Sequence, residues 1–124
     1  MHVELNHTIV PSTDKVRSSR FLAELLGLDP PQPVSHFMAL GLSNGVTLDY
    51  DDGTDFDRQH FAFLVADDGE FDAIFDRVVA AGITYYADPG HRVPGVVNDR
   101  GGGRGFYFED PDGHNMEVFT KVPL

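Results

Sequence analysis

Residues 105–117, Gly-Phe-Tyr-Phe-Glu-Asp-Pro-Asp-Gly-His-Asn-Met-Glu, contain a tight turn between two apolar segments. Pro111 fixes φ for the turn, Gly113 tolerates a positive φ, and the turn aspartates can accept hydrogen bonds from nearby backbone N–H groups. The segment therefore predicts a hairpin with strands at residues 106–108 and 115–119. We expect the acids of this turn to have a structural role.

The pattern of the hairpin also occurs in the first half of the chain. A glycine stands four residues before an acid in Gly113–Glu117 and again in Gly45–Asp49. Ahead of each hairpin, the first predicted strand of that half carries a histidine, His7 in one half and His60 in the other. We expect His114, just before the last strand, to face solvent. The chain is therefore interpreted as one motif present twice.

Each half is predicted to be a βαβββ module within one α+β domain, with module one at residues 1–52 and module two at residues 58–124. Two segments, residues 15–26 and 70–81, have apolar residues at helical spacing, and a glycine follows each segment. Both are predicted to be helices. Prolines in residues 28–33 predict an irregular connection. The remaining predicted strands are residues 2–10, 36–40, 46–50, 60–65 and 83–86.

The composition limits the classes of partner. The chain has 124 residues with 9 Lys+Arg against 20 Asp+Glu, for a net charge of −11. This balance argues against binding to nucleic acid or to an anionic membrane surface. No cysteine is present, so thiolate metal sites, disulfides and cysteine nucleophiles are excluded. No apolar run approaches the ~20 residues that span a bilayer. We therefore expect a soluble, cytoplasmic protein of one acidic domain.

Strand parity groups several side chains of the ligand type. In residues 60–65 the apolar side chains alternate with His60, which points to the opposite face. The same parity turns His7 and Glu117 away from the helices, with Asp49 as a possible fourth member. Two imidazoles and one carboxylate suffice to bind Fe, Mn, Ni, Co or Zn. The alternative is that these are ordinary strand histidines and a solvated acid.

These residues make the chain similar to the vicinal-oxygen-chelate superfamily, which includes glyoxalase I, extradiol dioxygenases, and fosfomycin and bleomycin resistance proteins. The resemblance covers about the full length. It rests on Asn6-His7, Leu25-Leu26-Gly27, Gln59-His60-Phe61-Ala62 and the Phe-x-Asp-Pro-Asp-Gly-x-x-x-Glu pattern that ends at Glu117. It implies two βαβββ modules that form a cupped mixed sheet with helices on the outer face, usually completed by a partner in a homodimer.

The resemblance also implies a site and an activity. It implies that His7, His60 and Glu117 bind one divalent metal, and it places the family's frequent fourth ligand at or beside Asp49. If Asp49 binds the metal, we expect glyoxalase-like proton transfer of the isomerase or lyase type. The metal would then activate a small oxygen-rich substrate as a Lewis acid, with Asp49 or Glu117 as the catalytic base.

Two alternative functions remain open from the sequence. If Asp49 does not bind the metal, the three remaining ligands suit an extradiol-type Fe(II) dioxygenase, although most such enzymes contain twice as many modules. A non-catalytic protein that binds a drug or metabolite is the other alternative, and the presence of the three ligands counts against it. Fosfomycin resistance activity is not expected, because Ile9 replaces a threonine of that branch and the loop before Gly105 lacks its lysine.

The loop at residues 88–105 is the main difference between the modules, since module two is longer by about 15 residues there. It contains Arg92, Arg100 and Arg104, which are predicted to bind an anionic substrate from a flexible lid. Tyr50 is a further candidate for substrate binding. The alternative is a surface loop whose arginines balance neighbouring acids.

Overall fold

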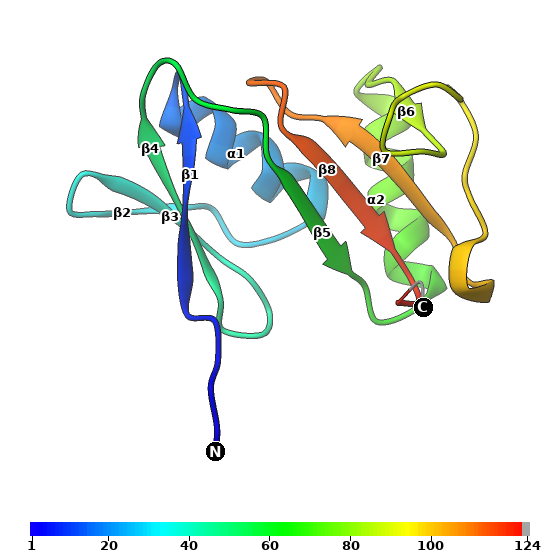
Figure 1. The fold of residues 1–124 in the computed structure, drawn as a ribbon, viewed down its shortest axis with the longest axis horizontal. Helices are drawn as coiled ribbons and strands as arrows, with labels where there is room; N and C mark the ends of the chain where they lie inside the picture. Colours follow the sequence, from blue (N-terminus) through cyan, green and yellow to red (C-terminus); the bar gives the residue numbers. More distant parts are fainter. Residues whose placement is uncertain (123–124) are drawn as a thin grey trace. The chain divides into compact units, whose positions relative to one another are not determined.

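The chain consists of two compact units, Met1–Asp57 and a second unit that begins at Arg58. The computed structural model describes residues 1–122. Each unit contains one α-helix and one four-stranded mixed sheet, so the predicted α+β class is confirmed (Figure 1). Within the described residues, no helix has the length and apolar character needed to cross a membrane.

Unit 1 is a four-stranded sheet with one helix packed on it. Its elements are β1 (His7–Ser12), α1 (Lys15–Leu26), β2 (Gln32–Val34), β3 (Phe37–Gly41) and β4 (Thr47–Asp52). The strand order is β1-β4-β3-β2, with β1 parallel to β4 and the other pairs antiparallel. The helix packs against β1, β3 and β4, and buries Leu22 with Val10 and Leu40.

Unit 2 repeats this topology. Its elements are β5 (His60–Leu64), α2 (Asp68–Ala80), β6 (Tyr85–Tyr86), the 3₁₀ turn η1 (Arg100–Gly102), β7 (Gly105–Glu109) and β8 (Asn115–Phe119). The strand order is β5-β8-β7-β6, with β5 parallel to β8. Aromatic rings join helix to sheet: Phe106 of β7 lies 5.4 Å from Phe71 and 5.5 Å from Phe75 of α2 between ring centroids.

The short strand β2 corrects the prediction of an irregular connection in residues 28–33. Pro33 sits in the middle of β2, opposite Met38 of β3. The strand lies at the edge of its sheet, where the missing N–H of a proline interrupts no second ladder. Pro11 occupies β1, the other edge strand, for the same reason. β2 is also the strand that completes the βαβββ order of unit 1.

The helix boundaries follow the capping residues. The first predicted helix, residues 15–26, matches α1 at both ends. The second begins two residues earlier than predicted, because Asp67 caps it by accepting a hydrogen bond from the Glu70 N–H at 2.9 Å. Ile83 does not start a strand, since its N–H bonds to the Val78 carbonyl in the end of α2. The sheet therefore resumes only at β6.

Candidate functional site

The parallel pair β5–β8 brings together two of the predicted metal ligands. Ala62 lies opposite Glu117, which places Glu117 two residues beyond His60 in the strand register. His60 Nε2 donates a hydrogen bond to Glu117 Oε1 at 2.9 Å. The His60 side chain is 47% exposed and that of Glu117 only 8%. A buried carboxylate thus holds an imidazole that solvent can reach.

Tyr107, which the sequence reasoning missed, completes this cluster. It lies opposite Glu117 in the antiparallel β7–β8 pair, and its ring centroid is 5.7 Å from that of His60. Arg100 Nη1 donates a hydrogen bond to the Tyr107 hydroxyl at 2.8 Å. In a hairpin that turns at residues 110–113, Tyr107 pairs with Glu117. The sequence of the hairpin therefore contained the information that these two residues are neighbours.

The surroundings of Tyr107 favour its protonated form. Burial raises the pKa of the Tyr107 phenol, and the negative charge of Glu117 and a hydrogen bond to it raise this pKa further, whereas Arg100 lowers it. The phenol therefore keeps its proton at neutral pH. It can offer this proton to the Glu117 carboxylate.

Unit 1 repeats the register with different side chains. Ile9 of β1 lies opposite Asp49 of β4, so Asp49 follows His7 by the same two-residue step as in unit 2. His7 is exposed, and its Nδ1 lies 2.8 Å from Asn6 Oδ1. Ala39 occupies the antiparallel position opposite Asp49. The acid of unit 1 therefore has no polar side chain at the position where unit 2 has a tyrosine.

Tyr50, a predicted substrate-binding residue, is placed in the core. It is fully buried, as is Leu48 at 3% exposure, whereas Asp49 between them is half-buried. Tyr50 lies opposite Val10 and Met38 in the two strand pairs. Because side chains alternate along a strand, Tyr50 points away from the face that carries Asp49. The structure does not bring it to the candidate ligands.

The full three-ligand set is not assembled within one unit. No group of three His, Asp or Glu side chains that could hold a metal ion occurs within residues 1–122. Unit 2 supplies the pair of His60 and Glu117, and His7 belongs to unit 1. Neither unit alone contains both predicted imidazole ligands.

The three arginines of the long loop are not brought together. Arg100 is the one beside the candidate ligand pair, through Tyr107. Arg104 instead forms ion pairs with acids of α2, the helix that packs on the opposite face of the sheet from Tyr107. Arg92 is exposed. Of the three predicted substrate-binding arginines, the structure therefore places Arg100 next to the site.

The long loop is also fixed to the sheet by His91. Its Nε2 donates to Asn115 Oδ1 at 2.7 Å, and its ring stacks on Tyr86 with centroids 4.2 Å apart. Its Nδ1 lies 3.4 Å from Glu109 Oε1. His91 has φ 56°, in the left-handed region that residues other than glycine rarely adopt. The segment predicted to be a flexible lid is thus tied down to β6, β7 and β8.

The turn before β8 is structural, as expected, but its histidine is not where we predicted. Asp110 Oδ1 accepts hydrogen bonds from the N–H groups of Asp112 and His114 at 2.9 and 2.8 Å. His114 is fully buried rather than facing solvent. Its Nδ1 accepts a hydrogen bond from the Gln59 N–H at 3.0 Å, so the ring satisfies a backbone donor at the start of β5.

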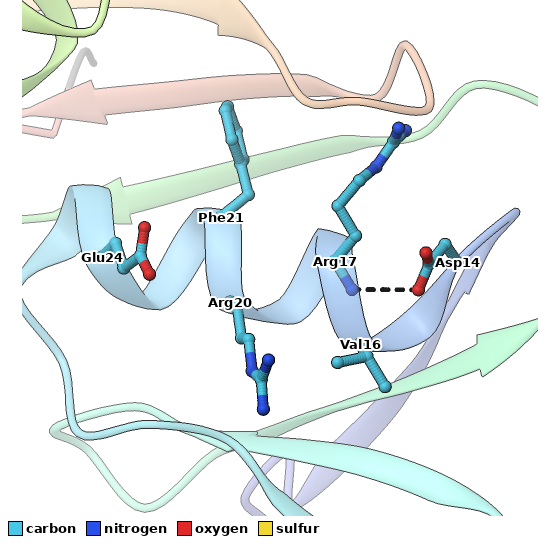
Figure 2. A pocket seen from close by; sticks show the side chains of 6 residues that line it. All are labelled: Asp14, Val16, Arg17, Arg20, Phe21 and Glu24. Carbon is cyan, nitrogen blue, oxygen red and sulfur yellow. Dashed lines mark hydrogen bonds between the residues drawn. The ribbon is translucent and has the colours of Figure 1, made fainter.

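A hollow of about 560 Å³ lies along α1. It is lined by Asp14, Val16, Arg17, Arg20, Phe21 and Glu24. Figure 2 shows Phe21 and Arg17 leaving one side of the helix and Arg20 the opposite side. Side chains that diverge in this way do not converge on one ligand. We assign no chemistry to this hollow.

Comparison with protein families gives a match over most of the chain. A family model described as the Glyoxalase/Bleomycin resistance protein/Dioxygenase superfamily matches residues 4–118. Among curated proteins, the glutathione transferase FosA from Serratia marcescens is 30% identical over 122 residues. The match covers 92% of this chain and 78% of that protein.

Solved structures include much more similar chains. Oxidase ChaP-H1 is 51% identical, with 98% of both chains covered and a TM-score of 0.94. Oxidase ChaP-H2 is 52% identical, with 98% of this chain and 96% of that chain covered and a TM-score of 0.94. At this identity and coverage, the two share their fold with this chain over nearly its whole length.

Proposed function

Because this chain belongs to the glyoxalase/bleomycin resistance protein/dioxygenase superfamily, we propose that it is a metal-dependent oxidase of a small, oxygen-rich substrate. The observation that carries the proposal is the similarity over nearly the whole chain to two structures named as oxidases. In such a reaction two electrons leave the substrate and reduce O₂. Among the reactions open from the sequence, this favours O₂ chemistry over isomerisation.

The proposed metal ligands are His7, His60 and Glu117. Two imidazoles and one carboxylate are the set that non-haem Fe(II) enzymes use, and the same set accepts Mn, Co, Ni or Zn. The residues fit this role, since His60 Nε2 and Glu117 Oε1 already converge to 2.9 Å. When bound, the metal would supply Lewis-acid activation of substrate oxygens and, as iron, one-electron redox chemistry.

Other residues of unit 2 are suited to bind the substrate. The guanidinium of Arg100 is exposed beside the Tyr107 hydroxyl, where it can pair with an anionic oxygen. Along β5, Ala62 and Leu64 are exposed on the same face as His60, and they offer an apolar surface. This combination supports a substrate with an apolar body and an anionic or acidic oxygen.

A second candidate function is glyoxalase-like isomerase or lyase chemistry. It is supported by the matched register of the two units, which gives Asp49 the position that Glu117 has in unit 2. A fourth ligand or free base at Asp49 would permit proton transfer next to a metal-bound carbonyl. Such turnover would consume no O₂, which distinguishes it from the oxidase reaction.

Two activities of relatives are not proposed for this chain. Ile9 is 51% exposed beside His7, where an apolar side chain offers no hydrogen bond to a phosphonate. Residues 88–105 contain no lysine. These residues argue against fosfomycin modification, although FosA is a relative. The presence of all three ligand-type residues argues against a purely non-catalytic binding protein.

We also propose a cytoplasmic homodimer, in which the ligands of one site come either from one chain or from two. Co-expression of differently tagged His7→Ala and His60→Ala chains tests this. If His7 and His60 of one site belong to different chains, the mixed dimer contains one intact site and retains metal. If both belong to the same chain, every site in the mixed dimer lacks one ligand and retains none.

The proposed function is tested first by metal content. Wild-type protein purified without chelator is expected to contain or take up about one metal per chain, and His60→Ala to contain almost none. After anaerobic loading with Fe²⁺, a panel of phenols, catechols and hydroquinones is screened for O₂ uptake, beside glutathione hemithioacetals as isomerase substrates. Absence of metal binding with Fe, Mn, Ni, Co and Zn would overturn the proposal. Turnover of a hemithioacetal without O₂ uptake would establish the second candidate instead.

A further inference from the structure

The Glu117 carboxylate is held between two side chains of its own sheet. His60 Nε2 donates to Oε1 from β5, and Tyr107 faces the carboxylate from β7, directly across the strand pair. Tyr107 is 2% exposed and Glu117 6% exposed. Water therefore competes little for the contact between the phenol and the carboxylate.

The guanidinium of Arg100 fixes the direction of the phenol proton. Arginine has donors only, so the Tyr107 oxygen must accept the 2.8 Å hydrogen bond from Arg100 Nη1. The phenol has one proton, and this proton is left for the Glu117 carboxylate, which faces Tyr107 directly across the strand pair. The three groups thus follow one another in order, with Arg100 bonded to the Tyr107 hydroxyl and Tyr107 placed opposite Glu117.

We propose that Tyr107 is a positioning residue for Glu117, and that Arg100 orients the Tyr107 hydroxyl so that the long loop controls the geometry of a metal ligand. This inference rests on the proposed function, because it assigns Glu117 to a metal. Neither Tyr107 nor Arg100 touches the metal in this scheme. Hydrogen bonds to a ligating carboxylate restrict its rotation, and their loss typically lowers metal affinity 10–100-fold.

The backbone of the loop holds Arg100 in place for this contact. Asn98 pairs with Gly105 at the start of β7, and its Oδ1 accepts a hydrogen bond from the Arg100 N–H at 3.2 Å. Gly101 follows with φ 65°, a conformation that favours glycine. The side chain of Arg100 lies over the Tyr107 ring, 5.5 Å from Cζ to the centroid. The position of the guanidinium is thus set by this part of the loop.

Unit 1 contains no counterpart of this arrangement. Ala39 stands opposite Asp49, where Tyr107 stands opposite Glu117. The loop that carries Arg100 has no equivalent between β2 and β3, which are joined by residues 35–36. The added hydroxyl and guanidinium are therefore specific to the acid that we assign as a ligand.

The experiment measures binding of Co²⁺ by its visible absorption in wild type, Tyr107→Phe, Arg100→Gln and Arg100→Lys. Tyr107→Phe keeps the ring and removes the hydroxyl, so its Kd for Co²⁺ is expected to rise about 10–100-fold. Arg100→Gln is expected to raise Kd by a smaller factor, and Arg100→Lys to recover part of it. Tyr85→Phe is the matched control, because Tyr85 lies on β6 and donates its hydroxyl to the Gly95 carbonyl, away from Glu117. Its Kd should equal that of wild type.

A metal-free measurement separates this inference from the proposed function. The ¹⁵N shifts of the His60 imidazole report whether Glu117 still accepts its hydrogen bond, and Tyr107→Phe is expected to change them while Tyr85→Phe is not. If wild type binds no Co²⁺, the proposed function fails, and the metal role of Tyr107 fails with it. If wild type binds Co²⁺ and Tyr107→Phe matches it in both Kd and His60 shifts, the positioning role alone is overturned.

Discussion

The two units of the molecule have the same topology and differ in chemistry. The strand order is β1-β4-β3-β2 in unit 1 and β5-β8-β7-β6 in unit 2, so the strand that carries the acid, β4 or β8, lies second in each sheet. In each, the acid lies two residues beyond the histidine in a parallel pair. The fold therefore supplies an equivalent position for an imidazole and a carboxylate in both halves.

The surroundings of the two acids differ. Glu117 is 6% exposed and contacts His60 and Tyr107. Asp49 is only half-buried, its side chain is one methylene shorter, and Ala39 lies across from it. A shared register thus gives the two acids different surroundings. The difference comes from the neighbour on the adjacent strand, which is Tyr107 for Glu117 and Ala39 for Asp49.

The largest effect is expected from substitutions of equivalent core residues in the two units. Phe106 in β7 and Met38 in β3 are equivalent by register, each beside the residue that faces the acid. Phe106 packs against aromatic rings of α2 and is fully buried, whereas Met38 is 9% exposed. Phe106→Ala is expected to lower the free energy of unfolding by about 4 kcal/mol and Met38→Ala by about 2 kcal/mol. Urea denaturation followed by circular dichroism measures both, and equal losses would contradict the difference.

The next effect concerns the two acids themselves. Glu117→Gln removes the charge of a proposed ligand and is expected to weaken Co²⁺ binding by more than about 100-fold, beyond the loss from a supporting residue. Asp49→Asn, the matched change in unit 1, is expected to weaken it less than about 10-fold. Calorimetric titration of both variants measures this. A similar loss in the two variants would show that the units contribute equal carboxylate ligands, and would favour the isomerase candidate.

The sequence predicted those features that follow from local period and capping. Alternation in β1 and β5 placed His7 and His60 on the exposed faces, and the burial patterns of both strands agree. Helix α1 was predicted to the residue, because Asp14 and Gly27 mark its ends. The equivalence of Asp49 and Glu117 followed from the glycine spacing. Gly45 and Gly113 each precede one of these acids by four residues in a hairpin.

The features that the sequence did not predict depend on neighbours distant in the chain. Tyr107 was not singled out, because its hydrogen bond from Arg100 depends on the conformation of the long loop. His114 was expected at the surface, because nothing local shows that its ring accepts the N–H of Gln59, 55 residues away. Pro33 locally predicts an irregular segment, and only the sheet order shows that it lies in an edge strand.

A smaller effect, which depends on pH, is expected at Asp110 in the turn of unit 2. Burial raises the pKa of the Asp110 carboxyl, although the backbone N–H groups of His114 and Asp112 oppose this. The folded state then holds the proton more tightly than the unfolded state, so Asp110 makes the free energy of unfolding fall as pH rises from 3.8 to its raised pKa. Asp110→Asn keeps the oxygen that accepts from both N–H groups.

The expected result for Asp110→Asn is a flatter dependence of stability on pH over that window. Asp110 Oδ2 is buried without a hydrogen-bond partner among the described residues. The change in the free energy of unfolding over this pH window should therefore stay within the ~1–3 kcal/mol that one buried, unpaired polar atom costs. Denaturation at several pH values between 3.5 and 7 measures the slope. Unit 1 lacks this turn, so Asp49→Asn serves as the control. A slope unchanged by Asp110→Asn would show that folding does not raise the pKa of this carboxyl.

The smallest effect is expected from the surface ion pairs that tie each helix to its sheet. Arg104 donates to Asp72 at 2.7 Å and to Asp68 at 3.3 Å, with its Cζ 4.2 Å from the centre of the Phe71 ring. In unit 1, Lys15 Nζ lies 3.9 Å from Asp52 Oδ2. Arg104→Gln is expected to cost about 1 kcal/mol, because exposed pairs contribute ~0.2–1 kcal/mol and the ring contact adds to them.

Lys15→Gln is expected to cost less than Arg104→Gln, since Lys15 loses a weak pair with Asp52 and one hydrogen bond to the His36 carbonyl. Both losses should shrink at 1 M salt, which screens exposed charges. Thermal unfolding at two salt concentrations measures this. A loss for Arg104→Gln that persists in high salt would assign its contribution to the Phe71 contact rather than to the acids. A change in Co²⁺ affinity in the same variant would instead show that the loop transmits this contact to Arg100, so that the whole loop supports Glu117.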